Sequence, residues 1–260
     1  MSSEYSLDGV DLDQPGRWRV MAGTTMPTVP APRLTSTEVP FRDGVIDGVG
    51  YRVGTSLVTI AFMVEGDSRA ALEVNWVALQ ARLRRTSRLS TLQYQPKGYG
   101  PRVAVVRLKS ISDPVYTHRE LLVETTAVFE VVHGVWEDKD WTVQPLSDMS
   151  ALSGGCAPMR NMTVMLLPTA SSMRIIDDES KTSLTWTGVL NGGQRVLVDV
   201  GSYSAVKQSD AGWDVTSQAV DISNEISMSH RGFQLAPDPE GKVSVTVTGG
   251  SGYVRAKKAY

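Results

Sequence analysis

The pattern of apolar and polar positions separates a first part of the chain, which contains one helical period, from a second part that contains none. Residues 57–64 form a near-continuous apolar run with several β-branched members. This run predicts a strand buried on both faces. The period changes after it, and a core-facing helical stripe is predicted by Leu72, Trp76, Leu79 and Leu83, which fall within about 60° of one another at 100° per residue.

The same predicted helix, which begins after Asp67 or Ser68 as N-cap, carries a second apolar strip on roughly its opposite side. A helix on the surface of a lone monomer does not need two apolar sides. We therefore expect a neighbouring subunit to cover the second strip. Its members are Ala70, Val74, Val77 and Ala81, of which Val74, Val77 and Ala81 form the predicted subunit interface.

Four arginines follow at the end of this helix and just beyond it. The favoured interpretation is that they complement the helix dipole and are solvated. The alternative is a basic patch that faces a partner chain or passing nucleic acid. No aromatic residue interleaves with them, so base stacking is not supported. They are Arg82, Arg84, Arg85 and Arg88.

The sequence before the helix predicts short strands and an extended arm. Residues 5–20 contain turn signals at Asp8-Gly9 and Pro15-Gly16, which predict two short strands. Residues 21–40 are rich in proline and small residues, a composition that favours an extended arm reaching a neighbour. Within the arm, Pro27, Pro30 and Pro32 are added to the predicted subunit interface.

The sequence after the helix predicts two long strands that complete an α+β domain. Residues 102–110 place alternate apolar side chains on one face, and residues 120–133 alternate apolar with polar positions. The second pattern is typical of a half-exposed antiparallel strand. Strand, helix and two further strands together predict an α+β first domain.

The second part of the chain predicts an all-β domain. The boundaries that we expect are an assembly domain over 1–143, a linker over 144–151 and a β-sandwich over 152–260. Residues 242–248 alternate valine with serine or threonine, as in a strand with one inward face. Asn191-Gly192-Gly193 predicts a hairpin to the strand at 195–200. Short strands with frequent turns indicate a sandwich of jelly-roll type.

Composition excludes several classes of function. The 26 basic and 28 acidic residues nearly cancel, which argues against a sequence-specific nucleic-acid-binding domain. One cysteine and three histidines leave little for a metal site, and we expect no cofactor. No apolar run is long enough for a membrane span and no signal-peptide core is present, so we expect synthesis in the cytoplasm.

Candidate catalytic residues do not form a recognisable constellation. Glu124 and Glu130 lie six positions apart on one predicted strand, roughly 20 Å at about 3.3 Å per residue, which exceeds the separation of a glycosidase pair. We expect solvated turn or edge positions without a chemical role for His118, His230, Cys156, Asp177 and Asp178. The sequence therefore predicts a protein that is not an enzyme.

Five aromatic residues of the second part are compatible with a sugar-binding surface as an alternative interpretation. Their commoner role is to fill the core of a sandwich. A carbohydrate-binding module and a glycoside hydrolase accessory or catalytic domain remain alternatives. The aromatic residues are Trp186, Tyr203, Trp213, Phe233 and Tyr253.

The order of these segments resembles the distal tail proteins of long-tailed bacteriophages, and most closely the minor tail proteins of phages that infect actinobacteria. The resemblance rests on the first segment, residues 5–12, on the single helix, on a strand pair at 190–199 and a late turn and strand at 233–247 in the second domain, and on the last segment, 253–260. It implies a mainly β protein with one long helix, in which an N-terminal α+β ring-forming domain is followed by a C-terminal galectin-like β-sandwich.

The resemblance also implies a function and a set of partners. A protein of this family is a structural virion protein at the tail tip of a siphophage. It is expected to form a hexameric ring that joins the tail tube protein to the tail-tip hub protein, with the tape measure protein in the lumen. No inserted carbohydrate-binding module is recognisable in this chain, which argues against direct receptor binding.

Overall fold

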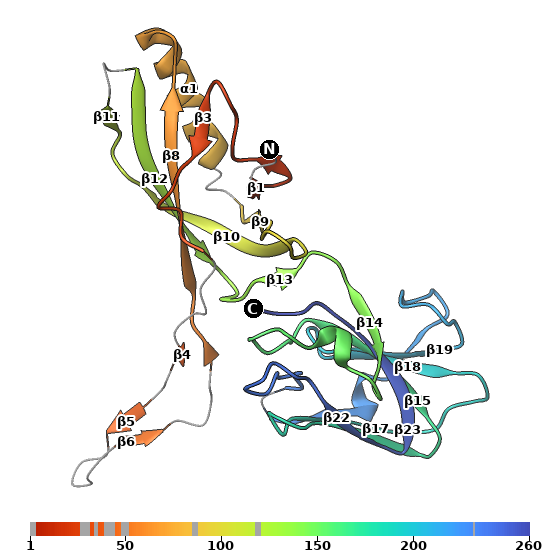
Figure 1. Ribbon diagram of the computed structural model, residues 1–260. Coiled ribbons are helices and arrows are strands. Elements are labelled where there is room, and N and C mark those ends of the chain that lie inside the picture. Colours follow the sequence, from red (N-terminus) through yellow and green to blue (C-terminus); the bar gives the residue numbers. More distant parts are fainter. Residues whose placement is uncertain are drawn as a thin grey trace. The chain divides into compact units, whose positions relative to one another are not determined.

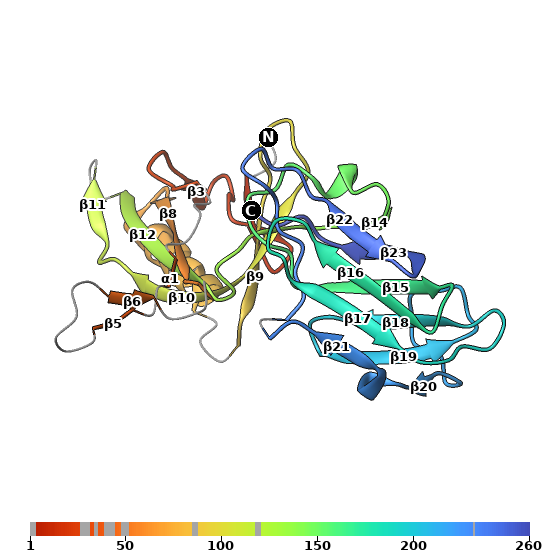
Figure 2. The same ribbon diagram turned by 90° about the horizontal axis from the view of Figure 1, so that it is seen from below.

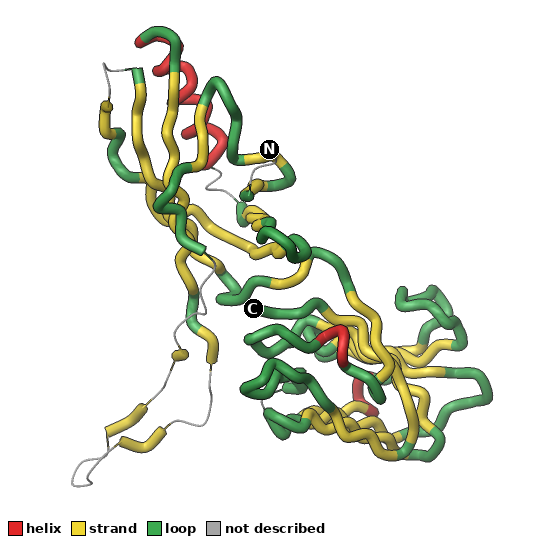
Figure 3. The backbone as a smooth tube through the Cα atoms, viewed as in Figure 1, coloured by secondary structure: helices red, strands yellow, loops and turns green. Residues whose placement is uncertain are grey.

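The computed structural model describes residues 4–26, 32–33, 36–38, 45–47, 52–84, 88–117, 121–230 and 232–260. The chain divides into two compact units, residues 1–139 and residues 140–260. Strands dominate both units, and the described residues contain one α-helix (Figures 1 and 3). That helix is too short and too polar to cross a lipid bilayer. The predicted mainly β fold with one long helix is confirmed.

The first unit is built on a nine-stranded sheet. Its main path runs β2-β1-β9-β10-β12-β8-β3, while β11 pairs with β12 and β13 pairs with β10. Every pairing in this sheet is antiparallel. The strands are β1 (Tyr5–Leu7), β2 (Val10–Asp11), β3 (Trp18–Val20), β8 (Ser56–Glu65), β9 (Ser90–Tyr94), β10 (Arg102–Ile111), β11 (Val115–Thr117), β12 (Leu122–Val131) and β13 (Glu137–Asp138).

The strand β8, which lies between β12 and β3 in the sheet, is buried on one face only, so the prediction of burial on both faces was wrong. Its inward side chains alternate with outward ones along the whole strand. Leu57, on the outward face, is 43% exposed. The prediction failed because apolar residues occupy both faces of the strand, although the helix covers only one of them. The inward residues are Ser56, Val58, Ile60, Phe62 and Val64.

The helix α1 (Arg69–Leu83) packs on β8 and β12 (Figure 1). Ser68 is the N-cap, and its hydroxyl accepts a hydrogen bond from the N–H of Ala71 at 3.2 Å. The predicted core stripe is confirmed at three positions, while Trp76 is half-buried. The fully buried members are Leu72, Leu79 and Leu83.

An aromatic cluster holds β1 in the first unit. The Tyr5 and Tyr94 rings stack with centroids 4.9 Å apart, and Trp136 meets Tyr94 edge-on at 6.3 Å. The Tyr5 hydroxyl donates to the carbonyl of Thr25 at 3.0 Å. Burial, and then the neighbouring Tyr94, raise the pKa of the Tyr5 phenol. These contacts fix the first described segment against β9.

The predicted extended arm contains paired strands. β4 (Pro32–Arg33) pairs with β7 (Arg52–Val53), and β5 (Ser36–Glu38) pairs with β6 (Val45–Asp47). These two ladders are separate from the nine-stranded sheet (Figure 1). The described part of the arm is therefore a hairpin, since each outgoing strand of residues 21–40 is paired with a returning one.

The second unit contains two antiparallel sheets (Figure 2). Their orders are β14-β23-β15-β18-β19-β20 and β21-β17-β16-β22. Buried side chains alternate along β16 and β17, which gives each strand one inward face. The strands are β14 (Thr142–Pro145), β15 (Met162–Pro168), β16 (Ser172–Asp177), β17 (Ser183–Thr187), β18 (Arg195–Asp199), β19 (Ser204–Gln208), β20 (Val220–Asp221), β21 (Ile226–Met228), β22 (Val245–Thr248) and β23 (Gly250–Ala256).

Two sequence predictions for the second part differ from the structure. Residues 144–151 do not form a separate linker: they include the end of β14, which pairs with β23, and most of the 3₁₀-helix η1 (Ser150–Leu152). The segment Asn191-Gly192-Gly193 does not close a hairpin, because β17 and β18 belong to different sheets. It carries the chain from one sheet to the other, and Gly193 supplies a positive φ of 81° for the turn.

Candidate subunit interface

The outer face of α1 exposes the apolar strip that the sequence predicted. Val74 is 64% exposed and Val77 is 61% exposed, while Ala70 and Ala81 on the same face are also exposed. The buried stripe accounts for this arrangement, because a helix that turns its leucines to the sheet turns these positions to solvent. In the single chain, the strip therefore lies open.

The apolar surface continues beside the first turn of the helix. The Arg69 guanidinium lies 4.3 Å from the centroid of the Tyr116 ring, which brings β11 next to α1, and Arg69 also pairs with Glu73 at 3.1 Å. Both Tyr116 and its neighbour Val115 are exposed, but they point to opposite faces of the sheet: Tyr116 lies beside the helix, whereas Val115 lies on the face away from it, with Glu124. The sequence analysis did not include these two residues, although two adjacent large apolar residues after Pro114 were a signal in the sequence.

The described arginines at the end of α1, Arg82, Arg84 and Arg88, do not act as one patch. Arg82 donates hydrogen bonds to the backbone carbonyls of Leu7 and Val10, and Arg88 pairs with Asp8 at 3.4 Å. These two arginines hold the β1–β2 turn.

Of the other two arginines, Arg84 is exposed and its N–H caps the helix by donating to Gln80, while Arg85 lies outside the described residues. A shared nucleic-acid surface is thus not supported.

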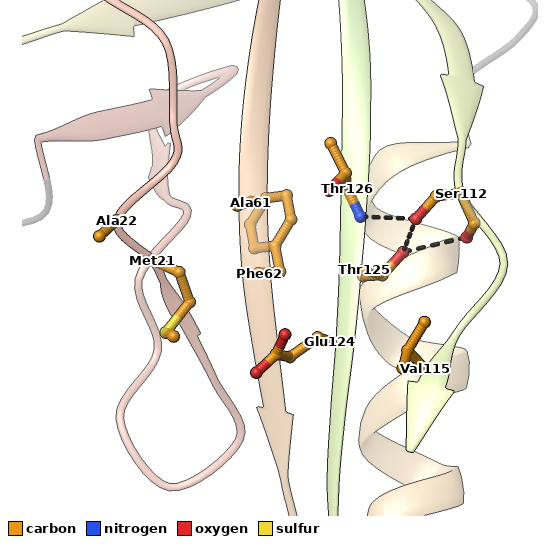
Figure 4. Close-up of a pocket in the computed structure, with 9 residues that line it drawn as sticks. All are labelled: Met21, Ala22, Ala61, Phe62, Ser112, Val115, Glu124, Thr125 and Thr126. Carbon is orange, nitrogen blue, oxygen red and sulfur yellow. Dashed lines mark hydrogen bonds between the residues drawn. The ribbon is translucent and has the colours of Figure 1, made fainter. Parts of the chain in front are cut away.

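The helix-free face of β8 and β12 contains a shallow cavity of about 230 Å³ (Figure 4). Ala61 and Thr126 form its floor, with Met21 and Val115 among its other lining residues. Glu124 extends over this face and is exposed (Figure 4). This is the outward face of the strand over residues 120–133 that the sequence predicted as half-exposed.

A charged pair lies on the same outward face. Arg107 of β10 and Glu130 of β12 are cross-strand partners, with Nη2 and Oε2 2.6 Å apart. The hydrogen bond from Arg107 lowers the pKa of the Glu130 carboxyl. Glu124 and Glu130 point from one strand, six positions apart, as expected.

The arm residues of the predicted interface are described only in part. Pro27 and Pro30 lie outside the described residues. Pro32 lies in β4, opposite Val53 of β7. Their part in a subunit contact therefore stays a prediction.

Residues that were considered for chemistry are dispersed. Cys156 and His230 are exposed, and His118 lies outside the described residues. Over the residues that the structure describes, no three histidine, cysteine or acidic side chains gather as metal ligands. Trp186 and Phe233 are buried and Trp213 is half-buried, whereas Tyr203 and Tyr253 are exposed, so the five aromatic residues do not form one surface.

Asp177 is not the solvated turn residue that the sequence suggested. Its side chain is fully buried. Oδ2 accepts a hydrogen bond from the N–H of Ser180 at 2.7 Å, and Oδ1 accepts one from the N–H of Ala236 at 3.1 Å. Burial raises the pKa of this carboxyl, hydrogen bonds from the Ser180 side chain and from the N–H groups of Ser180 and Ala236 oppose the rise, and the neighbouring Asp178 adds to it. The carboxylate has a structural role, because it ties the β16–β17 turn to residues 234–236.

Comparisons place the fold among phage tail proteins. No protein-family model and no curated protein matches the sequence. The crystal structure of the Dit protein of phage SPP1, called a paradigm of the hub adsorption apparatus in phages infecting Gram-positive bacteria, aligns with a TM-score of 0.66 and 15% identity. The alignment covers 99% of this chain and 98% of that chain. A chain of the activated phage p2 baseplate aligns with a TM-score of 0.36 and 11% identity, and the alignment covers 94% of this chain and 91% of that chain. The resemblance to distal tail proteins is confirmed at the level of the fold.

Proposed function

We propose that this chain is a structural protein of a siphophage tail tip and that its copies form a ring, expected to be hexameric. The observation that supports this most is the likeness to SPP1 Dit, which extends over both units of the chain. The exposed apolar strip on α1 adds to it, because a subunit contact would remove Val74 and Val77 from water. A structural role needs no catalytic constellation.

The proposed ring joins its subunits head to tail, so the strip meets a different surface on the next copy. The helix-free face of β12 and the hairpin of β4 to β7 are the two candidates. The β12 face offers both an apolar floor at Ala61 and an exposed carboxylate at Glu124. In this arrangement α1 is covered by sheets on both sides.

The proposed location is the tip of the tail, and the proposed partners follow from it. The ring would join the tail tube protein to the hub protein and surround the tape measure protein. The second unit, which we propose to be a galectin-like sandwich of jelly-roll type, would lie on the outside. Synthesis in the cytoplasm of the infected bacterium belongs to the same proposal.

Substitution of Val77 by Asp tests the ring contact. Val77 is 61% exposed in the single chain, and valine and aspartate have similar helix propensities, so the monomer should lose little stability. A buried, unpaired carboxylate in each contact would cost several kcal/mol, repeated around the ring. We expect folded monomers by light scattering, with an unchanged far-ultraviolet circular dichroism spectrum.

The matched control is Val189→Asp, since Val189 is an exposed valine of the second unit at 76%. This variant should assemble like the wild type. Rings formed by Val77→Asp would place the contact elsewhere, and unfolding of that variant would show that Val77 belongs to the core of its own unit.

A further inference from the structure

The strand β22 forms one edge of the four-stranded sheet in the second unit, because β16 is its one partner in that sheet. The N–H of Asp178 donates to the carbonyl of Ser244 at 3.1 Å, so these two residues form a hydrogen-bonded pair. Such pairs alternate along an antiparallel ladder. The register pairs Ile175 with Val247 and Asp177 with Val245, and the peptide groups of Val245 and Val247 must therefore point away from β16.

A second hydrogen bond supports this phase of the ladder. The N–H of Asp177 donates to the carbonyl of Thr182 at 2.9 Å, on the side of β17. Asp177 and Val245 therefore both direct their peptide groups away from each other. In the described part of the chain, no hydrogen bond is made by the outward N–H or C=O of Val245 and Val247.

A cavity of about 320 Å³ lies beside this edge. It is lined by Val245 and Val247 of β22, by Pro145 and Leu146 at the end of β14, and by residues 250–253 of β23. None of its lining residues carries a charge. The half-buried side chains of Val245 and Val247 give its wall an apolar character. The part of a ligand that enters this cavity must therefore be uncharged.

The edge of β14 in the other sheet is blocked, which makes the open edge of β22 distinctive. The N–H of Leu146 donates to Gly252 at 2.9 Å, so Val143 and Pro145 direct their peptide groups outward. Pro145 has no N–H to offer, and the Gln144 side chain donates to the carbonyl of Val143 at 2.9 Å. Proline and side-chain caps are devices by which proteins prevent strand addition at an edge. The edge of β22 has neither.

We propose that the edge of β22 binds an extended, uncharged segment of a partner protein by strand addition. The outward peptide groups of Val245 and Val247 supply two donors and two acceptors at the spacing of a strand, and alternate side chains of the segment enter the cavity. Main-chain hydrogen bonds give affinity, and the apolar cavity selects the side chains. This site lies in the second unit and does not depend on the proposed ring.

The experiment uses the full chain, labelled with ¹⁵N, and a synthetic peptide, acetyl-Thr-Val-Thr-Leu-Thr-Val-amide. We expect saturable changes in the amide signals of Val245 and Val247 in nuclear magnetic resonance spectra. Exchange of these two amides with solvent should slow by at least about tenfold at saturation, because each becomes a donor to the peptide. Absence of saturable binding, or changes centred on other residues, would overturn the proposal.

Two controls separate strand addition from simple apolar contact. The same peptide with alternate N-methylated residues keeps its side chains but loses its donors, and it should bind at least about tenfold more weakly. Val247→Pro removes one outward donor without touching the ladder to β16 and should weaken binding similarly, whereas Met228→Pro, on the opposite edge at β21, should not. Equal binding of the methylated peptide to the wild-type chain would refute strand addition, whether or not the proline variants fold.

Discussion

Substitution of Asp177 by Ala should destabilise the second unit, although the sequence around this residue is typical of a solvated turn. The substitution leaves the buried N–H of Ala236 without an acceptor, at a cost of about 1–3 kcal/mol. The N–H of Ser180 also loses its acceptor, but water can reach it, and the cost is about 1 kcal/mol. Removal of a carboxylate whose burial disfavours the charged form opposes these losses. We expect a net loss of about 2 kcal/mol.

Urea denaturation followed by tryptophan fluorescence measures this loss. With a slope of about 2 kcal/mol per molar urea, the midpoint should fall by about 1 M at unchanged slope. Asp178→Ala is the matched control: the Asp178 carboxylate accepts a hydrogen bond from the Thr246 hydroxyl at 2.8 Å in an exposed position, and its loss should stay within about 0.5 kcal/mol. Equal stability of Asp177→Ala and wild type would refute the reasoning, since it would mean that the hydrogen bonds to Asp177 contribute no more than the burial of its carboxylate costs.

Three further results are expected. Because burial raises the folded-state pKa of Asp177, wild type should gain stability relative to Asp177→Asn as the pH falls from neutral through that pKa towards its ordinary value of 3.8, measured by urea midpoints across pH; a constant difference would contradict this. Arg82→Ala should lower the free energy of unfolding by about 1–2 kcal/mol, because the carbonyls of Leu7 and Val10 lose a hydrogen-bond donor. Amide hydrogen exchange over β1 and β2 should become faster; unchanged exchange would contradict this prediction. Residues 140–260 expressed alone should give a folded all-β spectrum, and a disordered spectrum would refute independent folding.

Local patterns predicted much of the fold. The position of α1, its N-cap at Ser68 and the exposed strip at Val74 and Val77 follow from a 3.6-residue period, which depends on near neighbours alone. The alternation over β12 predicted a half-exposed strand for the same reason. The whole-chain likeness to distal tail proteins was visible in the order of the segments.

The predictions that failed depend on residues distant in the sequence. Turn chemistry at Asn191-Gly192-Gly193 fixes a local bend but cannot decide which sheet the next strand joins. The turn at Asp177 has two adjacent aspartates, and the inward one is selected by an N–H of Ala236, 59 positions away. The free edge of β22 likewise became visible only through its ladder with β16.

The topology of the first unit also sets the order in which it can fold. The longest ladder joins β8 to β12, with α1, β9, β10 and β11 between them in the sequence, and β1 pairs with β9 across most of the unit. Closure of such long loops costs chain entropy before any contact forms, so folding is slow compared with that of a helical protein. During synthesis α1 can form early from local contacts, while β8 has no long partner until Val131 has left the ribosome. The nascent chain therefore exposes the unpaired edge of β8 until almost all of the first unit has been made, and aggregation competes with folding during that interval.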